Sequence, residues 1–126
     1  MHRHALPQRV HQPPLRASRR IALTVVEDVD DGMAIAHEEV FGPVLTVFAY
    51  DEVREVTDYL NERPTPLAAY WFGPQEADFD TFRRHVRCGG MTVNDFALHA
   101  ALPDAPFGGM GQSGSGAYHG RTGFDT

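Results

Sequence analysis

Short apolar runs alternate with amphipathic segments along most of the chain, and this alternation limits the fold more than any other feature. The strand-like runs cover residues 21–26, 44–50, 67–72 and 91–94. Segments with helical spacing separate them, most clearly residues 76–87. Strands that alternate with helices are typical of α/β folds with parallel strands. We therefore predict an α/β fold with a mainly parallel sheet, flanking helices and a glycine-rich C-terminal loop.

The two longer helices are predicted from apolar residues that share one face. These residues are Val53, Val56 and Leu60 in the first helix, and Phe79, Phe82 and Val86 in the second. Asp51 is the expected N-cap of the first helix, and Asp31 is the expected N-cap of a short helix before residue 37. The strand over residues 44–50 is almost entirely apolar, so we expect both of its faces to be covered.

The composition excludes several classes of protein. No apolar run approaches the ~20 residues that span a membrane. The single cysteine, Cys88, excludes an internal disulfide framework and a cysteine-based zinc cluster. All eleven cationic residues are arginine, which excludes a Schiff-base lysine and a phosphate-loop lysine. The seven histidines have no metal-binding spacing, so we predict no metal site.

Positive charge is concentrated at the N-terminus. Residues 1–20 contain five arginines and no acid, whereas residues 21–126 contain all seventeen acids. The acidic body is a poor electrostatic match for nucleic acid. A targeting peptide and a nucleic-acid-binding arm are alternatives for the basic head. Three prolines interrupt any amphipathic helix there, so we favour a disordered head over residues 1–19.

The last thirty or so residues are rich in glycine, with seven of the twelve glycines between Gly108 and Gly123. We expect little regular structure there and a segment that is functional or needs a partner surface. Residues 109–114 match the G-x-G-x-x-G pattern of dinucleotide-binding loops. They do not directly follow a strand, as such a loop would. We interpret the pattern as a tight loop of small residues packed against backbone.

Two sites have a residue type that suits chemistry. Cys88 is expected near the C-terminal end of a helix, where the dipole disfavours a thiolate, so we interpret it as a small buried side chain rather than a nucleophile. Glu38 and Glu39 also fall at the unfavourable pole of a short helix, which indicates a function for the pair. A carboxylate at such a turn can accept two hydrogen bonds from a ribose diol. Phe41 can then pack against a flat ring.

Three motifs resemble those of the aldehyde dehydrogenase superfamily and occur in the family order. Residues 38–44 resemble E-E-[IV]-F-G-P-V, residues 89–95 resemble S-G-G-V-x-I-N-D, and residues 106–116 resemble P-F-G-G-x-x-x-S-G-x-G. The stretches 94–101 and 117–125 are most similar to the class-3-type branch, which includes fatty-aldehyde and coniferyl-aldehyde dehydrogenases. The resemblance implies that residues 20–126 are the C-terminal portion of the catalytic domain, which follows the disordered head of residues 1–19.

The resemblance also implies the chemistry. In this family a cysteine thiolate attacks the aldehyde, hydride passes to NAD or NADP, and a glutamate activates the water that hydrolyses the thioester. Both catalytic residues and the nucleotide-binding domain precede the E-E-V-F-G-P-V motif in the family. No catalytic residue is therefore expected in this chain, and Cys88 does not match the nucleophile.

The residues that do match the family are expected to contact the cofactor or support the active site. Glu39 matches the glutamate that hydrogen-bonds the nicotinamide ribose, and Phe41 matches the aromatic residue at the nicotinamide end. Asn94 matches an asparagine that supports the loop carrying the nucleophile. The scaffold residues of the loop near the substrate are Phe107, Gly108 and Gly109.

We expect a fragment of a cytoplasmic NAD(P)-dependent aldehyde dehydrogenase that is inactive alone. Its substrate is expected to be an aromatic or long-chain aldehyde similar to coniferyl aldehyde. An alternative is a non-catalytic module that docks on a full-length aldehyde dehydrogenase or on its N-terminal fragment. A third interpretation is a truncated reading frame with a non-native head. The expected partners are other copies of the chain or the missing N-terminal part, with neither nucleic acid nor a membrane span.

Overall fold

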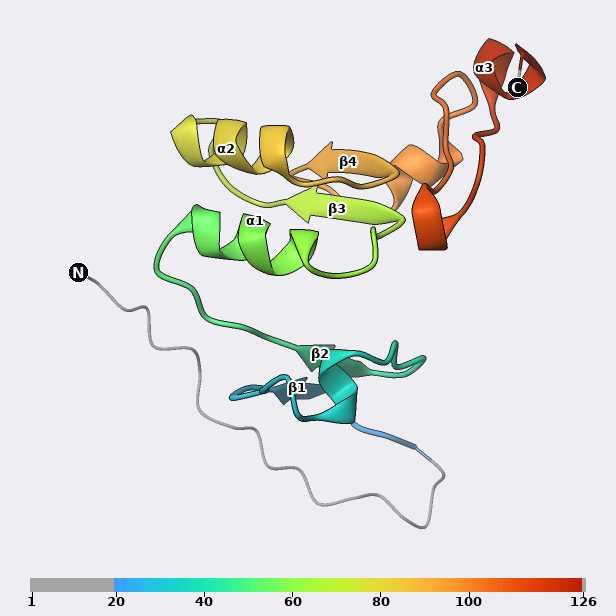
Figure 1. The fold of residues 1–126 in the computed structure, drawn as a ribbon. Coiled ribbons are helices and arrows are strands. Elements are labelled where there is room, and N and C mark those ends of the chain that lie inside the picture. The colour runs from blue at the N-terminus through green and yellow to red at the C-terminus, as the bar shows by residue number, and fades with distance from the viewer. Residues whose placement is uncertain (1–19, 126) are drawn as a thin grey trace. The chain divides into compact units, whose positions relative to one another are not determined.

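The computed structural model describes residues 20–125 (Figure 1). The elements are β1 (Thr24–Val26), η1 (Ala34–Ala36), β2 (Val44–Thr46), α1 (Val53–Asn61), β3 (Ala68–Trp71), α2 (Ala77–His85), β4 (Gly90–Val93), η2 (Leu98–Ala101), η3 (Gly111–Ser113) and α3 (Gly120–Asp125). Their order agrees with the predicted α/β alternation, and both strand pairs are parallel. The described residues form two compact units, which divide between Ala49 and Tyr50. The predicted head lies outside the described residues.

The first unit contains one parallel strand pair, β1 with β2, in which Val25 lies opposite Leu45. The Thr24 N–H donates to the Pro43 carbonyl at 2.8 Å, and the Val47 N–H donates to the Val26 carbonyl at 2.9 Å, so the ladder continues at both ends. The strands are shorter than predicted. Leu45 is 58% exposed, which contradicts the predicted covering of both faces of this strand.

The predicted short helix of the first unit is a 3-10 turn, η1, and its N-cap is Met33 rather than Asp31. The physical reason for this later start lies at Asp30, one residue before the predicted cap. The Asp30 carboxylate accepts a hydrogen bond from the Gly32 N–H at 2.7 Å. This side-chain bond forms a local turn over the residues that the prediction assigned to the helix start.

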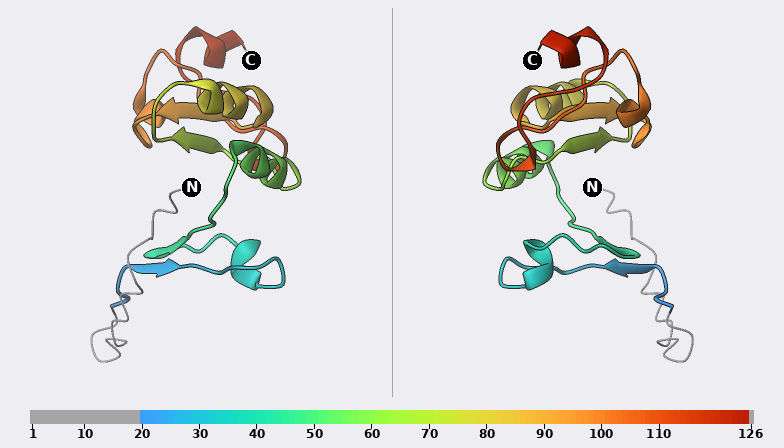
Figure 2. Two further views of the ribbon diagram at one scale, coloured as in Figure 1. Left: turned by 90° about the vertical axis from the view of Figure 1, so that its left-hand side faces the viewer. Right: turned by 90° about the vertical axis from the view of Figure 1, so that its right-hand side faces the viewer.

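The second unit is built on the parallel pair β3 and β4, with Ala69 opposite Met91. Helices α1 and α2 pack against each other and against one face of this pair (Figures 1 and 2). The buried cluster consists of Val53 from α1, Ala69 from β3, Phe82 from α2 and Val86 from the C-cap of α2. The helix faces that the apolar spacing predicted are therefore confirmed.

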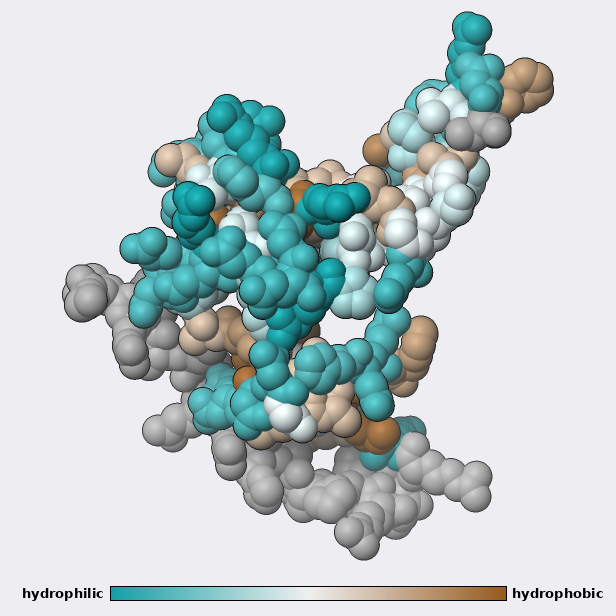
Figure 3. Space-filling view, viewed as in Figure 1, coloured by the Kyte–Doolittle hydropathy of each residue, from teal (hydrophilic) through white to brown (hydrophobic). Residues whose placement is uncertain are grey.

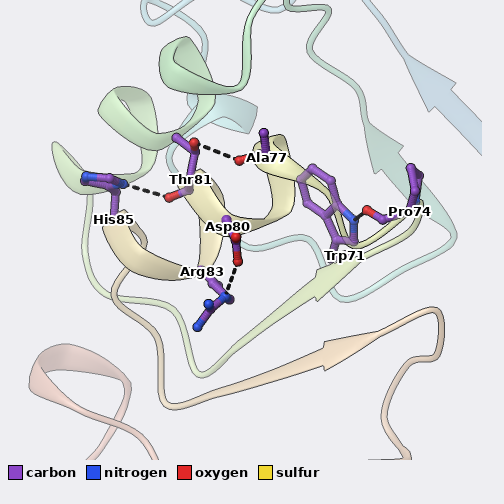
Figure 4. Close-up of polar contacts among 7 residues, drawn as sticks. All are labelled: Trp71, Pro74, Ala77, Asp80, Thr81, Arg83 and His85. Carbon is purple, nitrogen blue, oxygen red and sulfur yellow. Dashed lines mark hydrogen bonds and ion pairs between the residues drawn. The ribbon is translucent and has the colours of Figure 1, made fainter.

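The ends of the two longer helices differ slightly from the prediction. The N-cap of α1 is Glu52, and no side chain caps the helix, so the predicted cap at Asp51 is wrong. In α2, the Arg83 guanidinium donates to the Asp80 carboxylate at 2.7 Å (Figure 4). This hydrogen bond lowers the pKa of Asp80 below its usual value. Helix α2 ends at His85, two residues earlier than predicted.

The segment after β4 returns along the strand pair and ends in the glycine-rich region. In Figure 1 it reaches the ends of β3 and β4 from which the arrows start, which are their amino ends. Regular structure here is limited to η2, η3, the six-residue α3 and a bridge between Phe107 and Tyr118. The expectation of little regular structure is confirmed for residues 95–125.

Hydrophobic side chains reach the surface in both units (Figure 3). Those of the first unit include four on or beside its strand pair, namely Ile21, Leu23, Val25 and Leu45. Across residues 20–125, no helix combines the length and the apolar composition that a membrane crossing requires.

Candidate functional site

The predicted cofactor contacts lie on a turn of the first unit, between η1 and β2. The Gly42 N–H donates to the Val40 carbonyl at 2.9 Å, and the Val44 N–H donates to the Gly42 carbonyl at 2.8 Å. The next residue, Pro43, accepts the Thr24 N–H of β1. These bonds anchor the turn to the strand pair, so the backbone that carries Phe41 is held by both strands.

Both side chains that the motif assigns to the cofactor are exposed on this turn. Phe41 is 94% exposed, although a phenylalanine side chain is usually buried. Glu39 is also exposed and makes no hydrogen bond or ion pair within the described part of the chain. An exposed aromatic face beside an unpaired carboxylate provides one surface for a planar ring and acceptors for a diol.

Asn94 lies in the second unit, immediately after β4. Its amide oxygen accepts the Gly73 N–H at 2.8 Å, and its amide nitrogen donates to the Gly73 carbonyl at 3.1 Å. The backbone at Asn94 has φ +54°, a left-handed conformation that asparagine tolerates better than most residues. Asn94 therefore clamps the carboxyl end of β4 to the turn that follows β3.

Replacing Asn94 tests this clamp. Asn94→Ala removes two hydrogen bonds of about 1 kcal/mol each and leaves a β-carbon in the left-handed region, so we expect a loss of about 3 kcal/mol. Asn94→Gly removes the same bonds without that backbone cost and is expected to lose about 1 kcal/mol less. Urea unfolding followed by Trp71 fluorescence measures both. Equal stabilities for the two variants would show that the left-handed backbone contributes nothing.

The predicted scaffold loop begins with Phe107, Gly108 and Gly109. A β-carbon on Gly108 would lie 2.1 Å from the Gly116 carbonyl oxygen, and one on Gly109 would lie 2.2 Å from the Ser113 carbonyl oxygen. The Ser113 hydroxyl also exchanges hydrogen bonds with the Met110 backbone at 3.0 and 2.9 Å. The loop is thus folded tightly on its own backbone, as the interpretation of the glycine pattern expected.

The structure separates Asn94 from this loop. Gly108 approaches Gly89, whose β-carbon would lie 2.2 Å from the Gly108 carbonyl oxygen and 2.6 Å from that of Leu67. Gly89 precedes β4 and Asn94 follows it, so the two points are about 16 Å apart along the strand at about 3.3 Å per residue. Within the second unit, the two groups of predicted scaffold residues therefore lie at opposite ends of the β3–β4 pair.

Cys88 packs against the buried cluster of the second unit. Burial raises the pKa of the Cys88 thiol above its ordinary value, and backbone hydrogen bonds at Gly90 and Ala69 offset only part of this effect. The thiol form is therefore favoured at neutral pH, whereas a nucleophile needs the thiolate. The structure thus agrees with the interpretation of Cys88 as a small side chain in the packing.

No local pattern in the sequence predicts the environment of His99. Its ring lies 5.7 Å from that of Tyr70 and 5.2 Å from that of Phe107, and both ring nitrogens are buried without a hydrogen-bond partner in the described chain. His99 also contacts Gly90, so it fills the space between β3, β4 and the loop. A lone histidine in a sequence does not reveal such a setting, because the setting depends on contacts made by distant residues.

No group of three histidine, cysteine, aspartate or glutamate side chains within residues 20–125 is arranged to hold a metal ion.

Comparison with known proteins gives consistent matches over most of the chain. The sequence profile of the aldehyde dehydrogenase family matches residues 5–126. A probable coniferyl aldehyde dehydrogenase from Caulobacter vibrioides is 48% identical over 84% of this chain and 22% of the relative. Aldehyde dehydrogenase family 3 member A2 from Macaca fascicularis is 46% identical over 87% of this chain and 23% of the relative.

A solved structure matches the fold as well. Betaine aldehyde dehydrogenase from Staphylococcus aureus in complex with NAD+ has a TM-score of 0.72 and 32% identity. The match covers 82% of this chain and 20% of that protein. The chain thus spans only about a fifth to a quarter of the length of the proteins that it matches.

Proposed function

The chain belongs to the aldehyde dehydrogenase family, and from this membership we propose that it contributes to an NAD(P)-dependent oxidation of an aldehyde to its carboxylic acid. The substrate we propose is an aromatic or long-chain aldehyde similar to coniferyl aldehyde. Its support is the 48% identity to a relative named as a probable coniferyl aldehyde dehydrogenase. Because these residues span 22% of that relative, the activity is proposed for the assembled enzyme.

The observation that carries the proposal is the turn with Glu39 and Phe41. We propose that the Glu39 carboxylate accepts hydrogen bonds from the nicotinamide ribose and that the Phe41 ring packs at the nicotinamide end. The exposure of both side chains supports these roles, since neither needs to give up a partner within residues 20–125 before it binds. When bound, NAD or NADP supplies the hydride acceptor. The NAD+ complex of the Staphylococcus aureus relative supports this cofactor.

The remaining matched residues have structural roles in this proposal. Asn94, Phe107, Gly108 and Gly109 support the walls of the active site, while the nucleophilic cysteine and the basic glutamate come from sequence outside these 126 residues. No residue of this chain then forms or breaks a bond of the aldehyde, and the chain alone is inactive. We place the protein in the cytoplasm, whose reducing conditions suit an unpaired cysteine.

A chimera tests the proposal. Residues 20–126 replace the matching region of the Caulobacter vibrioides relative, and NADH or NADPH formation from coniferyl aldehyde is followed by absorbance. We expect turnover by the chimera. Glu39→Gln is expected to lower kcat/KM by ~10- to 100-fold, because a charge-assisted hydrogen bond to the ribose is lost. Glu38→Gln is the matched control, with an expected change below about 2-fold.

The outcomes distinguish the parts of this proposal. A folded chimera without turnover would contradict the proposed function. Equal effects of Glu39→Gln and Glu38→Gln would contradict only the role of Glu39. The chain alone is expected to form no NADH or NADPH. Turnover by the chain alone that Cys88→Ser abolishes would contradict the proposal that the nucleophile lies elsewhere.

A second candidate function is an interaction module, supported by the exposed apolar residues of the first unit. Parallel strands are usually buried on both faces, whereas this pair exposes Val25 and Leu45 at the same register position. Unpaired strand edges also favour association with another chain. We propose docking on the N-terminal portion of an aldehyde dehydrogenase or association between copies. Sedimentation velocity tests association between copies, and co-purification tests docking on the N-terminal portion. A stable monomer that does not bind the N-terminal portion would contradict this proposal.

A further inference from the structure

A pocket of about 570 Å³ opens in the second unit at the carboxyl end of β3. Its floor contains Val53 and Phe82 of the buried cluster, together with Trp71. Its rim is formed by the residues just before α1 and those just after β3. None of the lining residues is among those that the family motifs assign to the cofactor or the active-site scaffold.

Hydrogen bonds hold the rim of the pocket in place. The Trp71 indole N–H donates to the Pro74 carbonyl at 3.0 Å (Figure 4). The Asn94 amide pairs with both backbone groups of Gly73. The Trp71 ring lies 5.3 Å from that of Phe82 and 5.7 Å from that of Phe79, so the floor is packed as well. The pocket is therefore preorganised, which reduces the entropic cost of binding.

The lining of the pocket combines aromatic rings with negative charge. Tyr50, Trp71 and Phe72 provide aromatic surface, and Phe72 is 67% exposed. The carboxylates are Asp51, Glu76 and Asp78, and the lining contains no arginine or histidine. The N-termini of α1 and α2 at the pocket contribute about one positive charge in total, which offsets only part of the three negative charges. A cation is therefore the ligand that this lining favours.

Among biological cations, guanidinium matches both features of this lining. It is planar, stacks on aromatic faces and donates paired hydrogen bonds to carboxylates. An ammonium group offers neither the planar surface nor the paired donors. The rim is open enough for Tyr50 and Phe72 to remain exposed, which suits an extended peptide that crosses it. We propose that this pocket binds an arginine-rich peptide segment, with guanidinium groups on its aromatic wall and paired with Asp51, Glu76 and Asp78.

The sequence of this chain provides a suitable probe. Residues 7–20 read PQRVHQPPLRASRR, with four arginines and no acid. In a free peptide of this sequence, the prolines favour an extended backbone. Trp71 is the only tryptophan of the protein and lines the pocket, and the probe contains no tryptophan or tyrosine, so Trp71 emission reports occupancy directly. The experiment titrates this synthetic peptide into residues 21–126, because residues 7–20 of the full chain have the same sequence and would compete for the pocket.

We expect a saturable change in Trp71 emission. In the pocket variant Asp51→Asn, Glu76→Gln, Asp78→Asn, the apparent Kd is expected to rise at least ~10-fold, because all three charge-assisted contacts are weakened. The control variant Asp58→Asn, Glu62→Gln, Asp104→Asn has the same net charge but changes exposed residues outside the pocket. Its Kd is expected to change less than about 2-fold, because surface charges far from the pocket contribute little to peptide binding.

Three results would overturn the proposal: no saturable change in Trp71 emission, equal weakening by the two triple variants, or a peptide with lysine in place of arginine that binds as tightly.

Circular dichroism establishes that each variant is folded. If the pocket variant does not fold, Glu76→Gln alone is used. Glu76 is exposed and its side chain makes no capping hydrogen bond to α2. The single change is then expected to weaken peptide binding by ~2- to 5-fold, and an unchanged Kd would contradict the proposal.

Discussion

Gly108→Ala is expected to destabilise the second unit by about 3 kcal/mol or more. The added β-carbon would lie 2.1 Å from the Gly116 carbonyl oxygen and 2.8 Å from the Ala117 α-carbon. Both neighbours are backbone atoms, so no flexible side chain can move aside, and the loop must shift as a whole. The free energy of unfolding is measured by urea denaturation, with Trp71 fluorescence and far-UV circular dichroism followed together.

Gly116→Ala is the matched control for this prediction. Gly116 has φ +78°, but a β-carbon there would meet no atom within 4 Å. Its expected cost is therefore only the left-handed backbone penalty of about 1 kcal/mol. If Gly108→Ala costs no more than Gly116→Ala, the close packing of the loop on residues 116 and 117 does not contribute to stability.

Phe82→Ala is expected to cost about 3 to 5 kcal/mol, because a fully packed aromatic side chain is lost and a cavity remains. Phe82 is 7% exposed and contacts Trp71 in the only buried cluster of the described residues. That cluster is small, so few other buried contacts remain to stabilise the fold when the Phe82 side chain is removed. Thermal unfolding followed by far-UV circular dichroism is expected to show a much lower Tm, or no cooperative transition.

Phe124→Ala provides the comparison for Phe82→Ala. Phe124 is 90% exposed, and its replacement is expected to change the free energy of unfolding by less than about 0.5 kcal/mol. Similar losses for the two variants would contradict the assignment of the core to the cluster around Phe82.

Much of the fold follows from local patterns in the sequence. The spacing of Val53, Val56 and Leu60 predicted the buried face of α1, and the alternation of strands and helices predicted parallel pairing. The lengths of the strands were less predictable. The apolar run over residues 44–50 yields only Val44–Thr46 as strand, since ladder hydrogen bonds require a partner at each position. The cap at Asp31 was wrong because Asp30 forms a competing turn.

The residues of the candidate site come from sequence motifs, and their contacts with the cofactor stay a prediction. The motif around Glu39 and Phe41 identified the residues, and their exposure supports the proposed contacts with NAD or NADP. The position of Asn94 could not be read from its motif. Its two hydrogen bonds to Gly73 connect residues twenty-one positions apart in the sequence, and no local pattern encodes that pairing.

The sequence by itself determined the order of the elements, the parallel pairing, the faces of α1 and α2 and the family of the protein. These properties depend on periodicity and on motifs that are contiguous in the chain. Only the tertiary structure decided that Gly108 touches Gly116 and Gly89, that His99 lies between Tyr70 and Phe107, and that three carboxylates line one aromatic pocket. The physical reason is that steric exclusion, ring packing and summed charge depend on distances between residues far apart in the chain.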